Sequence, residues 1–391
     1  MPSPHLAAAP EPELSLPGWI YRDPEFFEVE MERVIRPSWQ VVCHCNEIAA
    51  AGDWRTLDYL GESILVVRGD DGVVRAFSNV CRHRGSRVVS GASGCARRLT
   101  CPYHAWTYAL DGRLIGVPNR SDYPGLETSG LGLVPIELEC WRGFLFVRLE
   151  GGGPSVAEMM APHEAEVAPY RFEAMEALGR VTLRRREVNW KNVADNYSDG
   201  LHIPVAHPGL TRLFGRGYSV SAGEHVDRMA GDLIERPSAN PSERAYQKHL
   251  PAVPHLPAEL QRRWLYFKLW PNVAFDIYPD QIDFMQFLPV AATRTVIREI
   301  SYALPDADMP ERWRREMKAT RYLNWRINRR VNAEDSALIA GVQQGMESRS
   351  YVPGPLGESE VCLRSFARKI RRLIPEANLH HSPKAGWSRN A

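Results

Sequence analysis

The sequence predicts an α+β protein, with a small all-β unit near the N-terminus and a larger unit in which helices lie beside a sheet. Between about Trp39 and Glu150, short β-rich runs such as "SILVVRG" and "GFLFVRLE" alternate with turn signals such as "GDDG" and "LDGR". After the glycine-rich stretch at residues 150–154, helical patterns and aromatic strands take over. We therefore place a domain boundary at this stretch.

We expect three segments. Residues 1–37 form an N-terminal arm and one amphipathic helix, framed by Pro24 and Pro37, which packs with the larger domain. Residues 38–150 form the β domain. Residues 151–391 begin with a helix-like stretch and a basic strand, "VTLRRREVNW", followed by aromatic strands over "WLYFKLWPNVAFDIYPDQIDFMQFLPV". A long helix or helix pair covers "PERWRREMKATRYLNWRINRRVNAEDSALIAGVQQGM", and "ESEVCLRSFARKIRRLI" forms a last amphipathic helix.

Composition argues against several classes of function. The 48 basic and 47 acidic side chains nearly cancel, so no long-range field favours nucleic acid or an acidic membrane. No stretch approaches the roughly 18 apolar residues of a membrane-spanning helix, and the Pro- and Ala-rich start lacks the pattern of a signal peptide. We therefore expect a cytoplasmic protein that binds neither nucleic acid nor membrane. The seven cysteines, an odd number, favour metal binding or catalysis over a disulfide scaffold.

The β unit carries two motifs that each combine a cysteine with a histidine. "CRHRG" contains Cys81 and His83, and "CPYHAW" contains Cys101 and His104, with residues 84–100 between them. Two thiolates and two imidazoles that converge suit either a zinc site or a Rieske [2Fe–2S] cluster. A zinc finger usually pairs Cys with Cys and His with His. Here each loop supplies one of each, and this interleaving favours a cluster whose two irons have different ligands.

A further group, "VVCHCN", is interpreted as core packing. In the predicted strand, Cys43 and Cys45 share one face and His44 points to the other. Cys95 lies between the two cysteine–histidine motifs in the sequence and is not assigned as a ligand.

The segment "NVADNYSDGLHIPVAHPGL" brings Asp199, His202 and His207 close together. Its first part can be helical up to the leucine before His202, so the two histidines lie at the helix end and in the following turn. Two imidazoles and one carboxylate form the facial triad of mononuclear non-haem Fe(II) sites, which leaves positions open for O2 chemistry. The histidine pair alone equally suits a structural role. Our candidate for the third ligand is Asp335 in "NAEDSALIAGVQQGM", with its neighbour Glu334 as the alternative.

The order of these motifs resembles that of one enzyme family. An N-terminal helix, "CRHRG…CPYHAW", "NWKNVADNYSDGLHIPVAHPGL", an aromatic sheet and "EDSALIAGVQQGM" follow one another between about Trp19 and Ile374. This order is similar to that of the catalytic α subunit of Rieske non-haem iron oxygenases, the ring-hydroxylating oxygenases. The resemblance implies a small all-β Rieske domain inserted near the N-terminus of a larger catalytic domain. That domain would be helix-grip-like, with helices and an antiparallel sheet, and would hold the mononuclear iron.

The resemblance also implies a role for each motif residue. Cys81, His83, Cys101 and His104 would bind one [2Fe–2S] cluster. The ligands of one Fe(II) would be His202, His207 and Asp335.

The resemblance further implies a homotrimer with head-to-tail contacts, in which the cluster of one subunit faces the iron of the next. Asp199, three residues before the first iron histidine, would bridge this gap by accepting hydrogen bonds from the neighbour's cluster histidine, His104, and from an iron histidine. A helix-end cap or a surface charge is its alternative role. Electrons would come from NAD(P)H through a separate flavin or iron–sulfur reductase or a ferredoxin. The chain itself lacks a nucleotide fingerprint, since "GRGYS" has no strand–GxGxxG–helix context.

With O2 and these electrons, we expect hydroxylation of a small organic substrate, an aromatic one. The alternative is a monooxygenase or N-demethylase of a quaternary ammonium or betaine-type substrate. A Rieske electron-transfer protein with an inactive binding domain is the non-oxygenase alternative. The stretch "VQQGMESRSYVPGPLGESEVCLRSFARKI" resembles the choline- and betaine-type monooxygenases. That group often has Glu at the bridging position, whereas Asp199 is typical of aromatic hydroxylases.

The aromatic segment is expected to supply the pocket walls, although most of its rings belong in the core. An apolar pocket suits an aromatic ring, and an aromatic cage suits a quaternary ammonium ion through cation–π contacts. The candidates are Trp264, Tyr266, Phe267, Trp270, Phe275, Tyr278, Phe284 and Phe287.

Overall fold

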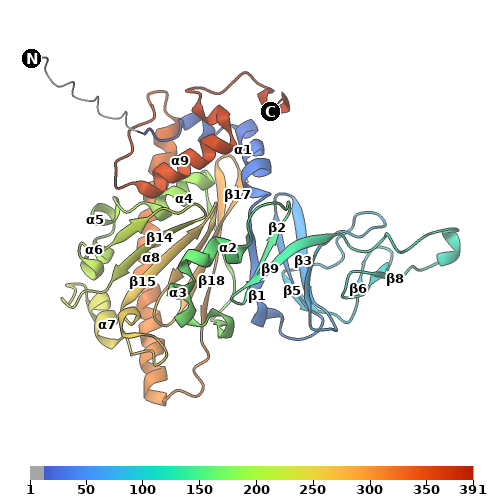
Figure 1. Cartoon of the computed structure of the whole chain (residues 1–391), viewed down its shortest axis with the longest axis horizontal. Helices are drawn as coiled ribbons and strands as arrows, with labels where there is room; N and C mark the ends of the chain where they lie inside the picture. The colour runs from blue at the N-terminus through green and yellow to red at the C-terminus, as the bar shows by residue number, and fades with distance from the viewer. Residues whose placement is uncertain (1–12, 391) are drawn as a thin grey trace, which may run out of the picture.

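Two antiparallel sheets form the frame of the computed structural model, which describes residues 13–390 (Figure 1). Most of the predicted N-terminal arm lies outside the described residues. The first sheet and its loops form an elongated lobe at one end of the long axis, and the second sheet with its helices forms the larger lobe. The α+β class and the arrangement of a β domain before a helix-and-sheet domain are confirmed.

The first sheet has seven strands in the order β1-β10-β9-β4-β3-β2-β5. A small three-stranded sheet, β6-β7-β8, lies at the tip of this lobe (Figure 1). The strands are β1 (Gln40–His44), β2 (Asp53–Tyr59), β3 (Glu62–Arg68), β4 (Val74–Ser78), β5 (Ser93–Cys95), β6 (Leu99–Thr100), β7 (Thr107–Tyr108), β8 (Leu114–Gly116), β9 (Pro135–Trp141) and β10 (Phe144–Arg148). As predicted, Cys43 and His44 are buried core residues, but Cys45 is not on the predicted strand, because β1 ends at His44 and the half-buried Cys45 begins a 3-10 helix.

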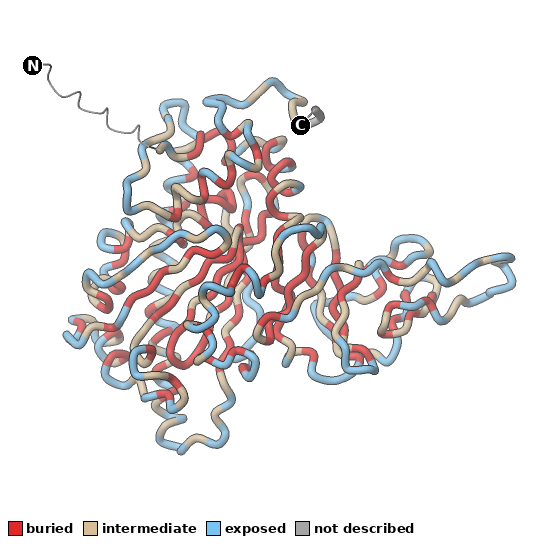
Figure 2. Tube along the Cα trace, viewed as in Figure 1, coloured by how far each residue is buried: buried red, intermediate tan, exposed pale blue. Residues whose placement is uncertain are grey.

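The second sheet has eight strands in the order β11-β18-β17-β16-β15-β14-β13, and β12 also pairs with β18. Its strands are β11 (Glu176–Ala177), β12 (Thr182–Arg186), β13 (Ser219–Ser221), β14 (Val226–Asp232), β15 (Arg263–Leu269), β16 (Val273–Ile277), β17 (Ile282–Ala291) and β18 (Arg294–Ala303). The core strands are buried along most of their length (Figure 2).

Helices surround this sheet. They are α1 (Pro24–Glu30), α2 (Val156–Met160), α3 (Glu164–Val167), α4 (Trp190–Ser198), α5 (Ile203–Ala206), α6 (Pro208–Phe214), α7 (Pro241–His249), α8 (Glu311–Glu347) and α9 (Val361–Leu373). The expected long helix or helix pair is one helix, α8, of 37 residues. α4 ends three residues earlier than the predicted limit, because Asp199 already has extended backbone angles (φ −78°, ψ 126°).

The N-terminal helix α1 lies beside the C-terminal segment. Asp23 caps it by accepting a hydrogen bond from the Phe26 backbone at 2.9 Å. The Trp19 indole donates to the Leu379 carbonyl at 2.8 Å, and the fully buried Glu30 pairs with Lys191 of α4 at 2.7 Å. These contacts join the first and last parts of the chain to the helix that leads into the predicted iron site. The domain boundaries at residues 37 and 150 stay a prediction.

Strand alternation sorts the aromatic segment onto two faces, because successive side chains of a strand point to opposite sides. Tyr266 of β15 lies opposite Asp276 of β16, and Asp276 lies opposite Asp283 of β17, so all three share one face. The other face is apolar and packs against the first lobe, with the rings of Phe144 and Phe275 5.0 Å apart. Phe267, Phe275 and Phe284 belong to that core.

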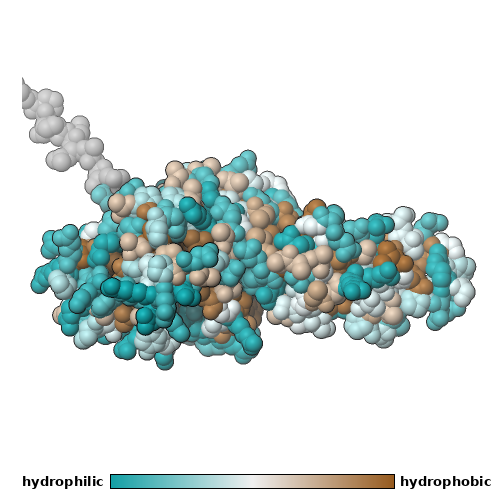
Figure 3. Space-filling model, turned by 90° about the horizontal axis from the view of Figure 1, so that it is seen from below, coloured by the Kyte–Doolittle hydropathy of each residue, from teal (hydrophilic) through white to brown (hydrophobic). Residues whose placement is uncertain are grey.

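Hydrophilic residues cover much of the surface seen in Figure 3, and hydrophobic residues form small groups among them. Within residues 13–390, no helix has both the length and the apolar character needed to cross a membrane.

Candidate metal centres and substrate cavity

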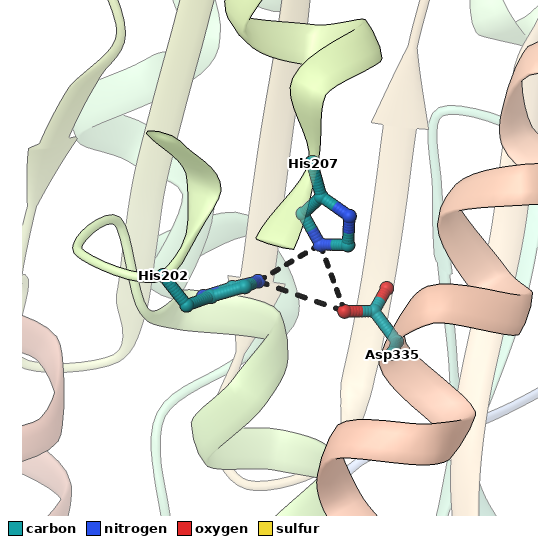
Figure 4. A group of neighbouring side chains, drawn as sticks. All are labelled: His202, His207 and Asp335. Atoms are coloured by element: carbon teal, nitrogen blue, oxygen red, sulfur yellow. Dashed lines mark hydrogen bonds and ion pairs between the residues drawn. The ribbon is translucent and has the colours of Figure 1, made fainter. Parts of the chain in front are cut away.

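His202, His207 and Asp335 converge on one point (Figure 4). His202 directly precedes the short helix α5, and His207 directly follows it, so this single turn places both imidazoles on the same side. Asp335 reaches them from the middle of α8. The His207 Nε2 atom lies 3.0 Å from His202 Nε2 and 2.9 Å from Asp335 Oδ1, and His202 Nε2 lies 3.5 Å from the same oxygen. Two imidazole nitrogens and one carboxylate oxygen are the donor set of a non-haem Fe(II) triad.

The second nitrogen of each imidazole faces a different carboxylate. The Nδ1 atom of His202 lies 3.1 Å from Asp199 Oδ2, and that of His207 lies 2.9 Å from Glu334 Oε2. A carboxylate at Nδ1 fixes the ring and leaves Nε2 free as a metal ligand. The geometry therefore separates the two neighbours that the sequence left open, because Asp335 faces the Nε2 atoms and Glu334 supports one ring.

Hydrogen bonds also set the charge of the triad. Burial favours the neutral form of Asp335, but hydrogen bonds from His202, His207 and Asn196 outweigh it and lower the pKa of this carboxyl to about 2. Burial opposes protonation of His202, but Asp199 and Asp335 outweigh it and raise the pKa of that ring to about 9. The Asn196 amide donates to Asp335 Oδ1 at 2.8 Å and holds it toward the histidines. These residues fit a divalent cation, which would replace the protons on the two rings.

The two cysteine–histidine loops meet at the tip of the β lobe. Cys81 and Cys101 are buried, and the rings of His83 and His104 lie 4.7 Å apart. The Nδ1 atoms of both histidines are buried and make no hydrogen bond within the described residues. His83 also stacks on Trp106 with an interplanar angle of 7°. Unpartnered nitrogens beside two buried thiols fit a cluster with Cys2His2 ligation.

The environment of Cys101 favours its thiolate form. Burial alone would raise its pKa, but hydrogen bonds from the backbone of Tyr103 and His104 and from the Cys81 thiol outweigh burial and lower the pKa. Metal–sulfur ligation requires the thiolate. The loop environment thus favours the form of Cys101 that binds a metal.

The two centres lie toward opposite ends of the long axis of the molecule (Figure 1). The cluster loops flank β6 and β8 at the tip of the elongated lobe, whereas α5 and α6 lie at the far side of the larger lobe (Figure 1). Asp199 lies beside His202 with 18% of its side chain exposed, and its Oδ1 also accepts a hydrogen bond from the Leu201 backbone at 2.8 Å. It therefore combines the helix-end role with a contact to a triad histidine.

A cavity extends from the triad along one face of the second sheet, the face that carries Tyr266 and Asp276. Helices α4 and α8 form its opposite wall. Of the eight aromatic candidates, Tyr266, Tyr278 and Phe287 line it, and the other five do not. Tyr197 and Tyr218 also line it, together with two charged residues of the sheet, Arg186 and Asp276. The tyrosine hydroxyls and these charges make it more polar than a pocket for a plain aromatic ring.

Comparison with known proteins places the chain. The family model for the ring hydroxylating alpha subunit catalytic domain matches residues 169–376, and the Rieske [2Fe-2S] domain model matches residues 38–135. The oxygenase subunit of carnitine monooxygenase from Escherichia coli (strain K12) is 30% identical over 352 residues, which cover 89% of this chain and 88% of that protein. The chain belongs to the Rieske non-haem iron oxygenases.

Other proteins resemble this chain over a shorter stretch of sequence or in their fold. The glycine betaine monooxygenase oxygenase subunit of Chromohalobacter salexigens is 38% identical over 198 residues, 50% of this chain and 44% of that protein. The crystal structure of the quaternary ammonium Rieske monooxygenase CntA with L-carnitine has a TM-score of 0.75 at 25% identity, over 94% of this chain and 97% of that one. Naphthalene 1,2-dioxygenase from a Rhodococcus species with bound indole has a TM-score of 0.72 at 20% identity, over 94% and 95% of the two chains, and this likeness concerns the fold alone.

The predicted family, fold class and cofactors are thus confirmed. This Rieske oxygenase is an oxidoreductase that uses one [2Fe–2S] cluster and one mononuclear iron. It is the oxygenase subunit of a multicomponent system, which needs a reductase, O2 and an organic substrate. The expected link to aromatic hydrocarbon catabolism is not supported, because the matched monooxygenases act on carnitine and glycine betaine.

Sequence reasoning missed Arg186 and Asp276. Asp276 is a charged residue within the otherwise apolar strand "VAFDI", and that interruption was the one signal available. Arg186 ends a run of three arginines, so nothing in its local sequence distinguished it from its neighbours.

Proposed function

We propose that this Rieske oxygenase is a monooxygenase of a quaternary ammonium compound. The support is the combination of the triad with a cavity that carries tyrosines and a carboxylate. The relatives named for carnitine and glycine betaine agree with it. A quaternary ammonium ion binds to aromatic faces through cation–π contacts, and a neighbouring carboxylate adds charge attraction. An apolar aromatic substrate would leave that carboxylate without a partner.

We also propose the residue assignments. Cys81, His83, Cys101 and His104 hold the cluster, and His202, His207 and Asp335 hold the iron. When bound, these groups supply single electrons and the reduction of O2 that hydroxylation of an unactivated carbon requires. Other residues of the chain orient the side chains that hold the iron. Asp199 and Glu334 fix the two imidazoles, and Asn196 directs the Asp335 carboxylate toward them.

We propose a head-to-tail homotrimer in which Asp199 bridges the centres of adjacent subunits. The support is that the two centres of one subunit lie toward opposite ends of its long axis (Figure 1). A solved CntA structure is also described as revealing inter-subunit electron transfer. In this arrangement Asp199 Oδ2 holds the His202 ring while the partner's cluster histidine approaches the same carboxylate. The domains of this subunit would be residues 1–37 with 151–391, and 38–150.

The substrate proposal is tested by O2 consumption. Metal-loaded protein, a Rieske reductase and NADH are given L-carnitine, glycine betaine, choline or naphthalene in turn, and uptake is compared with formation of oxidised product. We expect coupled uptake with at least one of the three ammonium compounds and none with naphthalene. Product from naphthalene alone would refute the proposal.

Complementation tests the trimer. A His104→Ala chain with a defective cluster and an Asp335→Ala chain with a defective iron site are coexpressed under two different affinity tags. Each variant alone should be inactive, and the doubly purified mixed oligomer should recover part of the activity, because some cluster–iron pairs across the interface are intact. An inactive mixed oligomer that retains the cluster of the Asp335→Ala chains and the iron of the His104→Ala chains would contradict the bridging arrangement.

A further inference from the structure

Asp276 is a carboxyl inside the cavity without a cationic partner. Its contacts within residues 13–390 are two hydroxyls, Tyr197 at 2.5 Å and Tyr278 at 3.5 Å, and no ion pair involves it. Two other buried acids are ion-paired, Glu30 with Lys191 at 2.7 Å and Asp227 with Lys268 at 3.1 Å. Asp283, which does not line the cavity, instead accepts hydrogen bonds from Gln281 and Ser301. A buried carboxylate without a counter-charge destabilises its ionised form, so this position favours a ligand that brings a cation.

Tyrosines surround this carboxyl. Tyr197 comes from α4, Tyr266 lies directly opposite Asp276 on β15, and Tyr278 follows β16. Tyr218 lies near Tyr266, with ring centroids 6.2 Å apart. Burial first, and then the charge of Asp276, raises the pKa of Tyr197, Tyr218 and Tyr278, so these phenols stay neutral. Neutral rings around one carboxyl form a cage that suits a methylated ammonium group, because such a group attracts both the ring faces and the carboxylate.

The same cavity is also lined by a positively charged residue, Arg186. Its Nη1 donates to the backbone carbonyl of Arg185 at 3.0 Å, while its Nε is buried and makes no hydrogen bond within the described residues. The neighbouring Arg184 is ion-paired with Glu299, whereas no ion pair of the described residues involves Arg186. A guanidinium with an unused N–H group can donate a hydrogen bond to a carboxylate.

The two charges lie at separate positions of the sheet. β12, which carries Arg186, and β16, which carries Asp276, are separated by β18 and β17. Three strand spacings put the two backbones about 14 Å apart. An extended arginine covers part of this distance, which leaves room between the charged groups for a short chain of a few bonds.

We propose that the cavity is built for a zwitterionic betaine, whose ammonium group binds at Asp276 and the tyrosines and whose carboxylate binds at Arg186. This assignment rests on the proposed quaternary ammonium monooxygenase and narrows its substrate class. Choline would fill the ammonium position and leave Arg186 unpaired. A neutral aromatic molecule would cover both groups without pairing either, and a charged group that loses water without gaining a partner disfavours binding.

The two charged residues, Asp276 and Arg186, also fix the orientation of the substrate in the cavity. Consecutive residues of α4 connect the two parts of the cavity, since Asn196 holds Asp335 of the triad and Tyr197 holds Asp276. A betaine that is held at both charged groups can therefore enter in one orientation only. Asp276 and Arg186 are positioning and specificity residues and touch neither the cluster ligands nor the iron triad in the described contacts.

The test compares binding of L-carnitine and choline by isothermal titration calorimetry on full-length, metal-loaded protein without O2. Asp276→Asn should weaken both ligands at least about tenfold, because one charged contact is lost in each case. Arg186→Gln should weaken L-carnitine at least about tenfold and change choline less than about twofold. The matched controls are Asp283→Asn, which faces Asp276 across β16–β17 but does not line the cavity, and Arg185→Gln, which is exposed. Both controls should bind like the unchanged protein.

Metal content and circular dichroism of each variant show whether it has folded. Unchanged affinity in folded Asp276→Asn, or equal loss for both ligands in folded Arg186→Gln, would overturn the assignment while leaving the monooxygenase proposal intact. If the unchanged protein binds neither of these two ligands nor glycine betaine, the proposed function fails and the assignment fails with it. If Asp276→Asn does not fold, Tyr197→Phe replaces it, and the assignment then requires a loss for both ligands.

Discussion

At the metal triad, each ligating side chain is held by another polar side chain, whereas no ion pair among residues 13–390 involves Asp276 or Arg186, which line other parts of the cavity. Asp335 is held by Asn196, and each triad histidine faces a carboxylate through its Nδ1 atom. Such a network fixes geometry before a ligand arrives. At Asp276 and Arg186 the ionised forms lack an ion-pair partner in the empty protein, and a ligand with complementary charges would stabilise them. One part of the cavity is therefore organised for chemistry and the other for recognition.

The largest effect is expected from removing the third ligand of the triad. Asp335→Ala should abolish turnover and mononuclear iron while leaving the cluster's visible spectrum and labile sulfide unchanged, because the two centres use separate loops. Glu334→Ala is the matched control on the adjacent position. It removes only the support of His207 and should lower iron affinity by roughly 10–100-fold. Substantial turnover by Asp335→Ala would remove this residue from the site and revive Glu334 as the ligand.

The next effect concerns the carboxylate that faces both His202 and the subunit exterior. Asp199→Asn keeps the size of the side chain and a hydrogen-bonding oxygen, so both metals and the fold should persist. Reoxidation of the reduced cluster in the presence of substrate and O2 should nevertheless slow strongly, because the charge that organises the proposed bridge is gone. Stopped-flow absorbance of the cluster measures this rate. A normal rate would leave Asp199 with its helix-end role alone.

The unpaired state of Asp276 predicts a pH signature in the ligand-free protein. Burial raises the pKa of this carboxyl to about 8, far above its unfolded value of about 3.9. A raised carboxyl pKa contributes stability that is complete below the unfolded pKa and is lost as pH rises toward 8. The difference in Tm between the unchanged protein and Asp276→Asn should therefore shrink or reverse from pH 5 to about 8 and stay level above it. A difference that does not change with pH would show that Asp276 is ionised and compensated in the empty cavity.

The smallest effect is expected from the hydroxyl of Tyr197. Tyr197→Phe removes its 2.5 Å hydrogen bond to Asp276 but keeps the ring of the cage. We expect KM for the ammonium substrate to change by about 2- to 10-fold with kcat nearly unchanged, since a hydrogen bond of this type contributes about 0.5–1.5 kcal/mol. A fall in kcat without a change in KM would place Tyr197 in the chemical step instead of in recognition.

The comparison also explains what could be predicted from the sequence. The cluster motifs are local, so their spacing alone indicated the chemistry, and His202 and His207 are five residues apart. Asp335 lies on another helix, so the sequence offered it only as a candidate beside Glu334, and the contacts of the His207 ring distinguish the two. The sequence left open whether residues 311–347 form one helix or two, because its pattern of charged and apolar residues neither marks a break nor excludes one.

The proposed binding residues, Asp276 and Arg186, could not be predicted from the sequence for a different reason. Whether Asp276 or Arg186 has an ion-pair partner depends on residues from strands and helices far apart in the chain. The spacing of residues in the sequence does not show that such a partner is missing. Likewise, strand alternation put Tyr266 and Phe267 on opposite faces, but which face lines the cavity depends on where α4 and α8 pack. The content of aromatic rings in the sequence likewise did not reveal that Asp276 lies among the tyrosines of the cavity.

The most direct test of the account is a single turnover without a reductase. Protein reduced chemically under anaerobic conditions is mixed with L-carnitine and then with ¹⁸O2, and the products are analysed by mass spectrometry. The account predicts oxidised product that carries one ¹⁸O atom from O2 before any exchange with water, and none from Asp335→Ala. Oxidation of the cluster without any product from L-carnitine, glycine betaine or choline would contradict it and favour the electron-transfer alternative.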